Sequence, residues 1–301
     1  MPEKTYLSLL SQIWRIIKTL EKYDCIVGTT SGIAFALGFW KVAGFLSRPI
    51  VAIHCGLVNN PYNKIRHYIT NKLLQSMHTV LYGDGEREPL LNMFPRINHK
   101  LTINQFGVDT NFWYPLTNGG NYILSIGNDG RRDYEILIDA AKSVPLPFKI
   151  ITSLTLSQNM PDNIHLLRGK WHSEIITDED IRSLYQKAMC VIIPLKESYQ
   201  PSGQSVCLQA MACGCPVVLT KTKGLWSSSM MKNRQNVLFI KPHNREDLID
   251  KINLLVNDEK LRNRLTKEGR KTVCECANSD TFARIIENCC LSVMDTEYNK
   301  H

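Results

Sequence analysis

Residues 201–220, PSGQSVCLQAMACGCPVVLT, form a polar, glycine-bearing loop that leads into a short apolar helix. The predicted helix start carries small or polar side chains and exposed backbone N–H groups: Ser202, Gly203, Gln204 and Ser205. Gly214 and Pro216 end the helix before a buried strand. Unpaired N–H groups and the positive end of a helix dipole favour an anion such as a diphosphate. An ordinary loop–helix–strand crossover has the same pattern, so both interpretations stay open at this point.

Two adjacent arginines give a second candidate for phosphate binding. Arg131 and Arg132 follow a strand-like segment and a loop that contains Gly127 and Asn128. A guanidinium group held beside a helix start binds phosphate oxygens through two parallel N–H donors and stabilises negative charge on a leaving group. A solvated pair of surface arginines is the alternative interpretation.

A single histidine ends an apolar strand in the first half of the chain. His54 follows the segment PIVAI, where an imidazole serves as a general acid or base, or donates to a substrate oxygen. Histidines at strand ends are also common as hydrogen-bonded structural residues. The sequence leaves both roles open.

Composition narrows the class of protein. The 301 residues include ten cysteines, a net charge of +8 and 44% apolar residues. Neither a secretory signal peptide nor a CxxC pair typical of structural zinc sites occurs, so we expect a cytoplasmic protein without a disulfide framework, a metal or another cofactor. The charge favours anionic partners, such as phosphorylated substrates or a membrane surface. Nucleic acid is disfavoured, because the lysines are dispersed over predicted helices without a recognised nucleic-acid motif.

The elements that must position these residues alternate between strand and helix. In the first half we expect strands over 24–30, 49–56 and 78–84, and helices over 5–22, 31–47 and 64–76. The helix over 5–22 is basic and amphipathic, which indicates either a core-covering helix or one that lies on a membrane surface. The alternation predicts a parallel sheet with right-handed crossovers.

The second half repeats this alternation. We expect strands beginning at residue 121 and over 148–154, 164–169 and 189–195, and helices over 177–188 and 245–273, the last as two surface helices. TNGG at 117–120 is the predicted linker, because it is polar and glycine-rich between two patterned halves. Loops at the carboxyl ends of the strands, including RGKWH (168–172) and KESYQPSGQS (196–205), are then expected to face a cleft.

The order of these loops resembles the retaining, metal-independent glycosyltransferases of the GT-B fold, family 4, also described as glycosyl transferases group 1. LQAMACGCPVV (208–218) is similar to the family's EAMACGxPVV segment, and FGVDTNFWYP (106–115) to its NGVDTxxFxP segment. The resemblance covers residues 24 to 275. It implies an α/β protein with two Rossmann-like parallel-sheet domains facing a cleft, an acceptor domain over 1–116 and a donor domain over 117–301.

The resemblance assigns roles to individual positions. His54 matches the family's histidine near the donor sugar. The loop after Gly127, NDGRRD, matches the loop whose basic side chains bind the diphosphate. Gln209 matches the second glutamate of the family's E-x7-E motif, which contacts the donor ribose. Four residues match the backbone amides that approach the phosphates: Ser202, Gly203, Gln204 and Ser205.

Three departures from the family pattern bear on activity. Pro201 and Gln209 stand where the motif has its two glutamates, and Glu197 is a candidate replacement for the first. Asn128 stands in place of the usual arginine, which leaves the two following arginines as the basic residues of that loop. Only one predicted helix precedes residue 24, so we expect a shortened, incomplete amino-terminal domain.

The resemblance implies a hexosyltransferase that moves a sugar from a nucleoside diphosphate sugar to a glycan or lipid-linked acceptor, with retention at the anomeric carbon and without a metal. It implies a cytoplasmic enzyme of polysaccharide or glycoconjugate biosynthesis, and peripheral contact with the membrane face is a further expectation. The missing carboxylates favour an alternative, a GT-B-like module that binds a nucleotide or glycan without catalysis. A sugar-nucleotide epimerase is a third interpretation.

Overall fold

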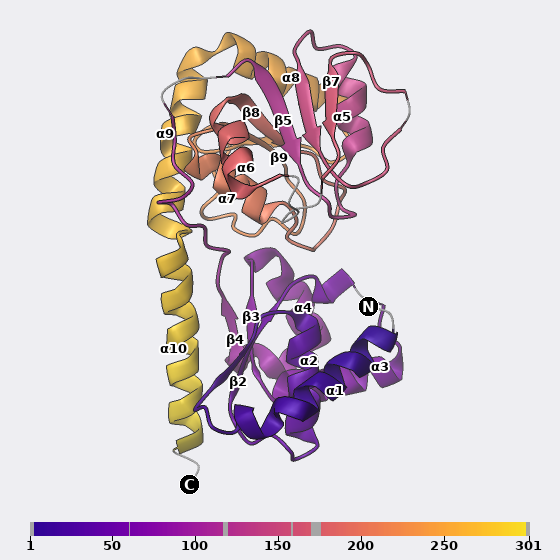
Figure 1. Ribbon diagram of the computed structural model, residues 1–301, viewed down its shortest axis with the longest axis vertical. Coiled ribbons are helices and arrows are strands. Elements are labelled where there is room, and N and C mark those ends of the chain that lie inside the picture. The colour runs from indigo at the N-terminus through magenta and orange to yellow at the C-terminus, as the bar shows by residue number, and fades with distance from the viewer. Residues whose placement is uncertain (1–2, 60, 117–119, 158, 170–175, 299–301) are drawn as a thin grey trace. The chain divides into compact units, whose positions relative to one another are not determined.

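The computed structural model describes residues 3–59, 61–116, 120–157, 159–169 and 176–298. It contains two compact units, each built on a parallel sheet, which confirms the predicted α/β class (Figure 1). The first unit comprises residues 1–105, 199–201 and 282–301, and the second comprises 106–198 and 202–281. The predicted domain boundary at residue 116 therefore falls inside the second unit. Residues 117–119 of the predicted linker lie outside the described residues.

The first unit has a sheet of four parallel strands in the order β1-β2-β3-β4. The strands are β1 (Ile26–Gly28), β2 (Ile50–His54), β3 (His78–Leu81) and β4 (Leu101–Ile103). All five residues of β2 are buried, because helices cover both faces of a parallel sheet. The three strands predicted in this half are confirmed with shorter bounds, and His54 is the last residue of its strand.

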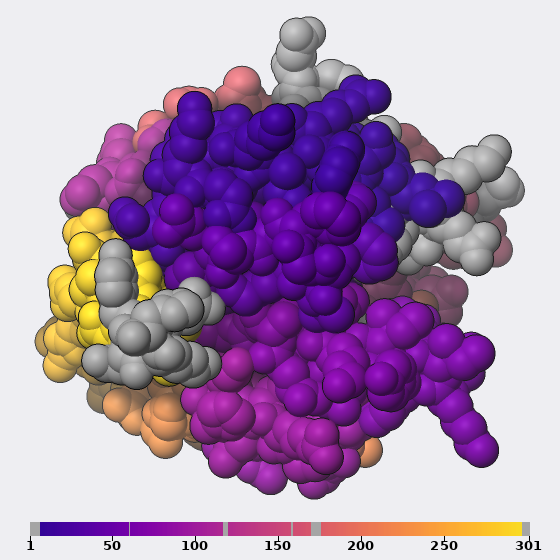
Figure 2. All heavy atoms as spheres, turned by 90° about the horizontal axis from the view of Figure 1, so that it is seen from below, coloured from indigo at the N-terminus to yellow at the C-terminus, as the bar shows by residue number. Residues whose placement is uncertain are grey.

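Alternate residues of β2 point to two separate cores. Ile50 and Ala52 pack in a cluster with α1 (Glu3–Leu20), α2 (Ser31–Val42) and α3 (Lys64–Gln75). Val51 and Ile53 pack on the other side against α10 (Ser279–Tyr298). The side chains of α1 and α2, indigo in Figure 2, form a continuous area of the surface. Short elements complete the unit: η1 (Leu57–Asn59), η2 (Asp84–Glu86), α4 (Arg87–Met93) and η3 (Pro95–Lys100).

The second unit has a sheet of six parallel strands in the order β10-β9-β8-β5-β6-β7. The strands are β5 (Tyr122–Ile126), β6 (Phe148–Ile151), β7 (Ile164–Leu167), β8 (Ala188–Ile193), β9 (Val217–Thr220) and β10 (Leu238–Ile240). The chain runs outward from β5 to β7 and then returns to β8 on the other side of β5. In open parallel sheets, ligands bind beyond the carboxyl ends of the strands at such a reversal. The topology therefore directs attention to the loops after β5 and β8.

Helices cover both faces of this sheet. Residues of α6 (Asp178–Gln186) and α7 (Gln204–Ala212) pack in one core cluster, and residues of α5 (Tyr134–Ala141) and α8 (Arg245–Asn257) pack in the other. Helix α9 (Glu259–Cys276) contributes to both clusters. The predicted pair of helices over 245–273 is confirmed as α8 and α9. Strand β10 and helix α10 were not predicted.

Arg270 on α9 explains why residues 106–116 belong to the second unit. Its guanidinium group donates to the carbonyl oxygens of Trp113 at 2.5 Å, Ala212 at 2.6 Å and Thr110 at 3.0 Å. The side chain of Trp113 is 6% exposed and lies in the core cluster that contains α7. This segment is therefore fixed to α7 and α9, which the hydropathy pattern does not reveal.

Candidate functional site

Arg132 lies in the loop that connects β5 to α5, and its side chain is only 2% exposed. The loop is tied to the neighbouring loop after β8, since Asp133 N–H donates to Pro194 O at 3.0 Å and Lys196 N–H donates to Arg131 O at 2.8 Å. The Nε atom of Arg132 pairs with Asp129 Oδ2 at 3.4 Å. Its Nη1 atom is buried without a hydrogen-bond partner among the described residues. A buried guanidinium with an unused donor is a strong candidate for binding an anion.

Two glycines make room for this guanidinium group. A Cβ atom at Gly127 would overlap Arg132 Nε, and a Cβ atom at Gly203 would lie 2.7 Å from Arg132 Nη1. The Gly127 carbonyl is held by the hydroxyl groups of Tyr134 at 2.9 Å and Thr152 at 2.7 Å. The end of β5 is thereby fixed, and any larger residue at these two positions would displace the arginine.

The first residues of α7 lie beside the same guanidinium. Gly203 precedes the helix with φ +77°, a left-handed conformation that glycine adopts most readily, and it provides no side-chain cap. Ser202 is 7% exposed, and its Oγ atom is buried without a partner in the described part of the chain. Ser202, Gly203 and Arg132 therefore gather an unused hydroxyl, the start of a nine-residue helix and an unused N–H donor. Together they form a candidate anion site at the reversal between β5 and β8.

Two other predicted donor-binding residues, Asn128 and Glu197, accept hydrogen bonds from the backbone of neighbouring loops. Asn128 Oδ1 accepts from Ser153 N–H at 2.6 Å. Glu197 Oε1 accepts from Lys223 N–H at 2.8 Å and from Ser198 N–H at 3.0 Å. Both side chains thus hold neighbouring loops in place. Arg131 is half-buried, and its backbone N–H donates to Asp129 Oδ1 at 3.0 Å.

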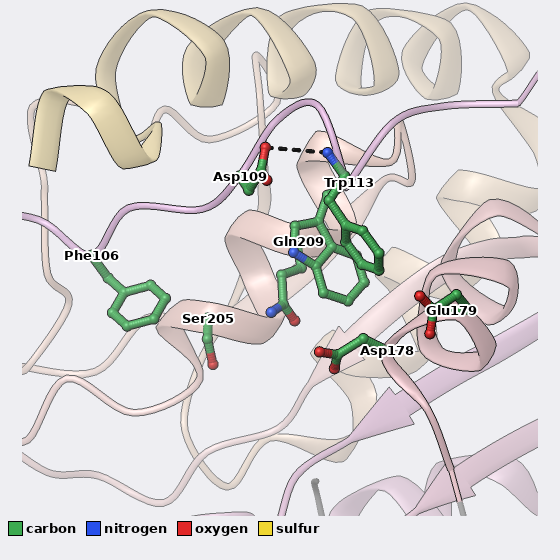
Figure 3. A pocket seen from close by; sticks show the side chains of 8 residues that line it. Phe106, Asp109, Trp113, Asp178, Glu179, Ser205 and Gln209 are labelled. Carbon is green, nitrogen blue, oxygen red and sulfur yellow. Dashed lines mark hydrogen bonds between the residues drawn. The ribbon is translucent and has the colours of Figure 1, made fainter. Parts of the chain in front are cut away.

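A cavity of about 790 Å³ lies beside α7. Ser205 and Gln209, one helical turn apart, line it together with Asp178 and Glu179 of α6 (Figure 3). The segment before β5 supplies the remaining wall: Phe106, Asp109, Phe112 and Trp113. A cavity of this size fits a drug-sized ligand or a nucleoside. The sequence singled out Ser205 and Gln209 as site residues and the segment 106–115 as family-like, but it did not indicate that this segment and the acidic residues of α6 surround them.

Gln209 presents an amide to this cavity. Its side chain is 8% exposed, and the Tyr185 hydroxyl lies 3.4 Å from its Oε1 atom as a hydrogen-bond donor. Asp109 has a structural role, because its Oδ1 atom accepts from Asn111 N–H at 2.8 Å and its carbonyl accepts from Trp113 N–H at 2.9 Å (Figure 3). Asp178 and Glu179 stand in the first turn of α6, where acidic residues favour the helix dipole. That helix start was visible in the sequence, but its position beside Gln209 was not.

His54 lies in the first unit at the carboxyl end of β2. It is fully buried, its Nδ1 atom lies 3.2 Å from Ser31 Oγ, and its Nε2 atom has no hydrogen-bond partner among the residues described. Burial lowers its pKa to about 3, so the imidazole is neutral at neutral pH. The ring centroid of Phe35 lies 5.1 Å from that of His54. A neutral imidazole with one free nitrogen can donate or accept a single hydrogen bond.

Glu86, the last residue of η2, is a buried carboxyl group that the sequence did not single out. It is 1% exposed, and its Oε2 atom accepts from Gly56 N–H at 3.0 Å. Burial raises its pKa to about 7, against the opposing effect of backbone N–H groups at Gly56, Val58 and Leu57. Glu86 therefore anchors the loop that follows His54.

Three further sequence features are the RGKWH loop, candidate metal ligands and the cysteines. Lys170, Trp171 and His172 of the predicted RGKWH loop lie outside the described residues. In the described ranges, no group of three or more His, Cys, Asp or Glu residues could hold a metal ion. The ten cysteines are all free thiols.

Comparison with known proteins finds a family match to part of the chain. Residues 151–272 match the family "Glycosyl transferases group 1". An uncharacterized glycosyltransferase of Methanocaldococcus jannaschii is 28% identical over 144 residues, which are 47% of this chain and 39% of that protein. The match therefore spans well under half the length of this curated relative.

Two solved structures have the same fold over nearly the whole chain. A sucrose-phosphate synthase from Thermosynechococcus elongatus superposes with a TM-score of 0.81 at 16% identity, covering 98% of this chain and 80% of that one. HepE of Anabaena, solved in complex with UDP, superposes with a TM-score of 0.76 at 16% identity, covering 94% and 82%. These likenesses show that the chain has the GT-B fold.

Proposed function

We propose that this protein is a glycosyltransferase that transfers a hexose from a nucleoside diphosphate sugar to an acceptor hydroxyl, with retention at the anomeric carbon and without a metal ion. The observation that carries the proposal is the buried Arg132 guanidinium, with its unused Nη1 donor, beside the start of α7. The family match over residues 151–272 supports the reaction class. HepE, a protein of the same fold, binds UDP, which supports a nucleoside diphosphate as the leaving group.

Arg132 would stabilise the charge that develops during transfer. When the bond between the anomeric carbon and the diphosphate oxygen breaks, its electron pair stays on the diphosphate. A fixed, desolvated guanidinium stabilises that charge more than water does, because it needs no reorganisation. Ser202 Oγ and the backbone N–H groups at the start of α7 would contribute further donors to the same phosphates.

Gln209 and His54 would bind other parts of the substrates. The Gln209 amide faces a cavity large enough for a nucleoside, so we assign it to the donor ribose. His54 would contact the donor sugar through its unpartnered Nε2 atom, as a neutral imidazole. A lipid-linked or glycan acceptor remains part of the proposal, and it rests on the family resemblance.

A second candidate function is a GT-B module that binds a donor without transferring the sugar. Pro201 and Gln209 favour it, because they replace both carboxylates of the family's motif. Proline offers no side-chain polar group, whereas glutamine keeps an acceptor oxygen and two N–H donors.

The test is a panel of nucleoside diphosphate sugars, with melting temperature and release of free nucleoside diphosphate measured in parallel. A ligand that binds the native state raises the melting temperature even without turnover. We expect one donor to give both signals, in the presence of a chelator. Arg132→Ala should lower the transfer rate by about 100-fold or more, as removal of a preorganised donor does. Arg264→Ala, at an exposed position on α9, is the charge-matched control and should retain activity.

A pair of glutamine variants tests the assigned ribose site. Gln209→Leu should weaken donor binding by roughly tenfold, the effect of a lost hydrogen bond. Gln186 is equally buried, but its Nε2 atom donates to Tyr114 O at 2.6 Å. Gln186→Leu should therefore lower stability and leave donor affinity unchanged. Stabilisation by a donor without nucleotide release, with every acceptor tried, would favour the binding module.

A further inference from the structure

Exposed apolar side chains are concentrated on one helical layer of the first unit. Sixteen large hydrophobic side chains are exposed among the described residues, and nine of them lie on α1, α2, α3 or the turn after α2. These nine are Leu7, Trp14, Ile16, Phe39, Val42, Phe45, Ile65, Tyr68 and Ile69. Scattered apolar residues are normal on a protein surface, but such a concentration marks an interaction site.

Four aromatic rings on α1, α2 and the turn after α2 form an aromatic cluster: Trp14, Phe39, Trp40 and Phe45. The Trp14 ring centroid lies 4.6 Å from that of Trp40 and 5.1 Å from that of Phe45, and the Phe39 centroid lies 5.2 Å from that of Trp40. Trp14 is 47% exposed and Phe45 is 55% exposed. Trp40 Nε1 donates to Leu10 O at 3.0 Å, so its polar group is satisfied and the ring is available for apolar contact. Amphipathic aromatic rings of this kind are enriched at membrane–water interfaces.

Helix α3 carries a second apolar feature, the α3 stripe. Ile65, Tyr68, Ile69 and Lys72 recur at positions i, i+3, i+4 and i+7, so they share one face of the helix, and all four are exposed. Ile65 is 72% exposed and Tyr68 is 62% exposed. Lys72 Nζ lies 5.8 Å from the Tyr68 ring centroid. An exposed apolar ridge bordered by basic side chains is typical of a helix that lies in a membrane interface.

Helix α2 packs between α1 and α3, so the cluster and the stripe belong to one layer. Gly38 on α2 leaves room for Met77, which follows α3, because a Cβ atom at position 38 would overlap the methyl group of Met77. The layer is also visible as adjacent helices in Figure 1.

Charge identifies the partner that this layer fits. Residues 1–76 contain nine Lys and Arg but three Asp and Glu, a net charge of 9 − 3 = +6, against +8 for all 301 residues. Helices α2 and α3 contain no acidic residue. Lys64, Arg66 and Lys72 are exposed along the α3 stripe, and Arg15 and Lys18 are exposed on α1. Basic residues are attracted to the negative potential of an anionic lipid surface.

We propose that the layer α1–α3 binds the surface of an anionic lipid bilayer, with the aromatic cluster and the α3 stripe inserted among the lipid headgroups. This peripheral docking goes beyond the proposed sugar transfer and does not depend on it. It would give a soluble donor and a membrane-embedded acceptor access to the same protein.

The test is flotation of the full chain with vesicles of phosphatidylcholine alone or with added phosphatidylglycerol. We expect the protein to float with the anionic vesicles, less at high salt because surface charges are screened, and not with phosphatidylcholine alone. Ile65→Ser/Ile69→Ser should lower binding by at least tenfold, since two exposed apolar side chains are lost. Leu291→Ser, at a 50% exposed position on α10, is the matched control and should float like the wild type.

Three results would overturn the proposal: no flotation with anionic vesicles, equal flotation with neutral ones, or equal flotation of the α3 variant and the wild type. If the layer instead joins two copies of the chain, light scattering would show a dimer that Ile65→Ser/Ile69→Ser converts to a monomer, without vesicle binding. The donor-induced rise in melting temperature should be the same in this variant as in the wild type. Failure of membrane docking is thereby distinguished from failure of the proposed transfer.

Discussion

The guanidinium group of Arg132 occupies the space that a side chain at Gly203 would need, with Nη1 2.7 Å from the position of the missing Cβ atom. The two residues come from neighbouring loops, one after β5 and one after β8. Glycine is therefore required at position 203 both for its φ of +77° and for this close approach.

An alanine in the left-handed conformation costs about 1–2 kcal/mol. Gly203→Ala should lower the free energy of unfolding by more than this amount, because its Cβ atom also pushes Arg132 aside. The same displacement should weaken donor binding. Chemical denaturation and calorimetric titration of the donor measure the two effects. Gly44→Ala is the control: Gly44 has φ +82°, but a Cβ atom there meets nothing within 4 Å. This control should show the backbone cost alone and full donor affinity. Unchanged donor affinity in Gly203→Ala would contradict the assignment of Arg132.

His54 should make stability fall as the pH is lowered. Its native pKa, about 3, lies below the ordinary value of 6.5, so the unfolded chain binds a proton that the native state refuses between these pH values. The contribution of His54 to the free energy of unfolding should therefore decrease as the pH falls from 6.5 toward 3. His54→Gln should remove this part of the slope in denaturation curves recorded over that range, and a slope that persists would show that another group causes it.

Glu86 should change stability with pH in the opposite direction to His54, over a pH range that overlaps that of His54. Its native pKa, about 7, lies above the ordinary value of 4.5, so the native state retains a proton that the unfolded chain loses. Its contribution to stability is complete below pH 4.5 and is lost as the pH rises through 7. Glu86→Gln should flatten this decrease, which urea denaturation at pH 5 and pH 8 would measure. A wild-type slope in the variant would mean that Glu86 titrates normally.

Arg270→Ala should destabilise the second unit by about 2–5 kcal/mol, because it leaves three backbone carbonyls without their charged donor. Thermal unfolding of the variant measures the loss. Lys271→Ala, at the exposed neighbouring position, should change stability by less than about 0.5 kcal/mol. Equal stability of the two variants would mean that Arg270 does not fix residues 106–116.

Local patterns predicted the elements well where glycine, proline and apolar periodicity agree. Gly214 and Pro216 ended the helix now seen as α7, and VVL formed β9. The run around residues 238–240 is too short to distinguish a strand from a loop by periodicity, so β10 was not predicted. Helix α10 was not predicted either. Its apolar residues pack on the first sheet, which lies far away in the sequence, so the local pattern does not reveal what they cover.

The candidate site was only partly predictable for a different reason. Gly127 and Gly203 lie against Arg132, and Ser202 adjoins Gly203, because β5 and β8 are neighbours in the sheet and the loops that follow them meet; the sequence predicted the loops but not this strand order. Asn128 and Glu197 were chosen for their chemistry, yet their oxygens accept from backbone N–H groups. Which polar side chains support loops and which stay unused depends on tertiary contacts that neither motif nor spacing encodes.

Helix α10 has a consequence for synthesis on the ribosome. Its residues cover the face of the first sheet formed by Val51, Ile53 and Val80, but they follow the entire second unit in the chain. Residues 106–198 and 202–281, which make up the second unit, can complete their core while translation continues. The first sheet keeps an apolar face uncovered until residues beyond 282 emerge. The first unit can therefore complete its core only after the whole second unit has been synthesised, and until then its apolar sheet face is a surface that a chaperone would bind.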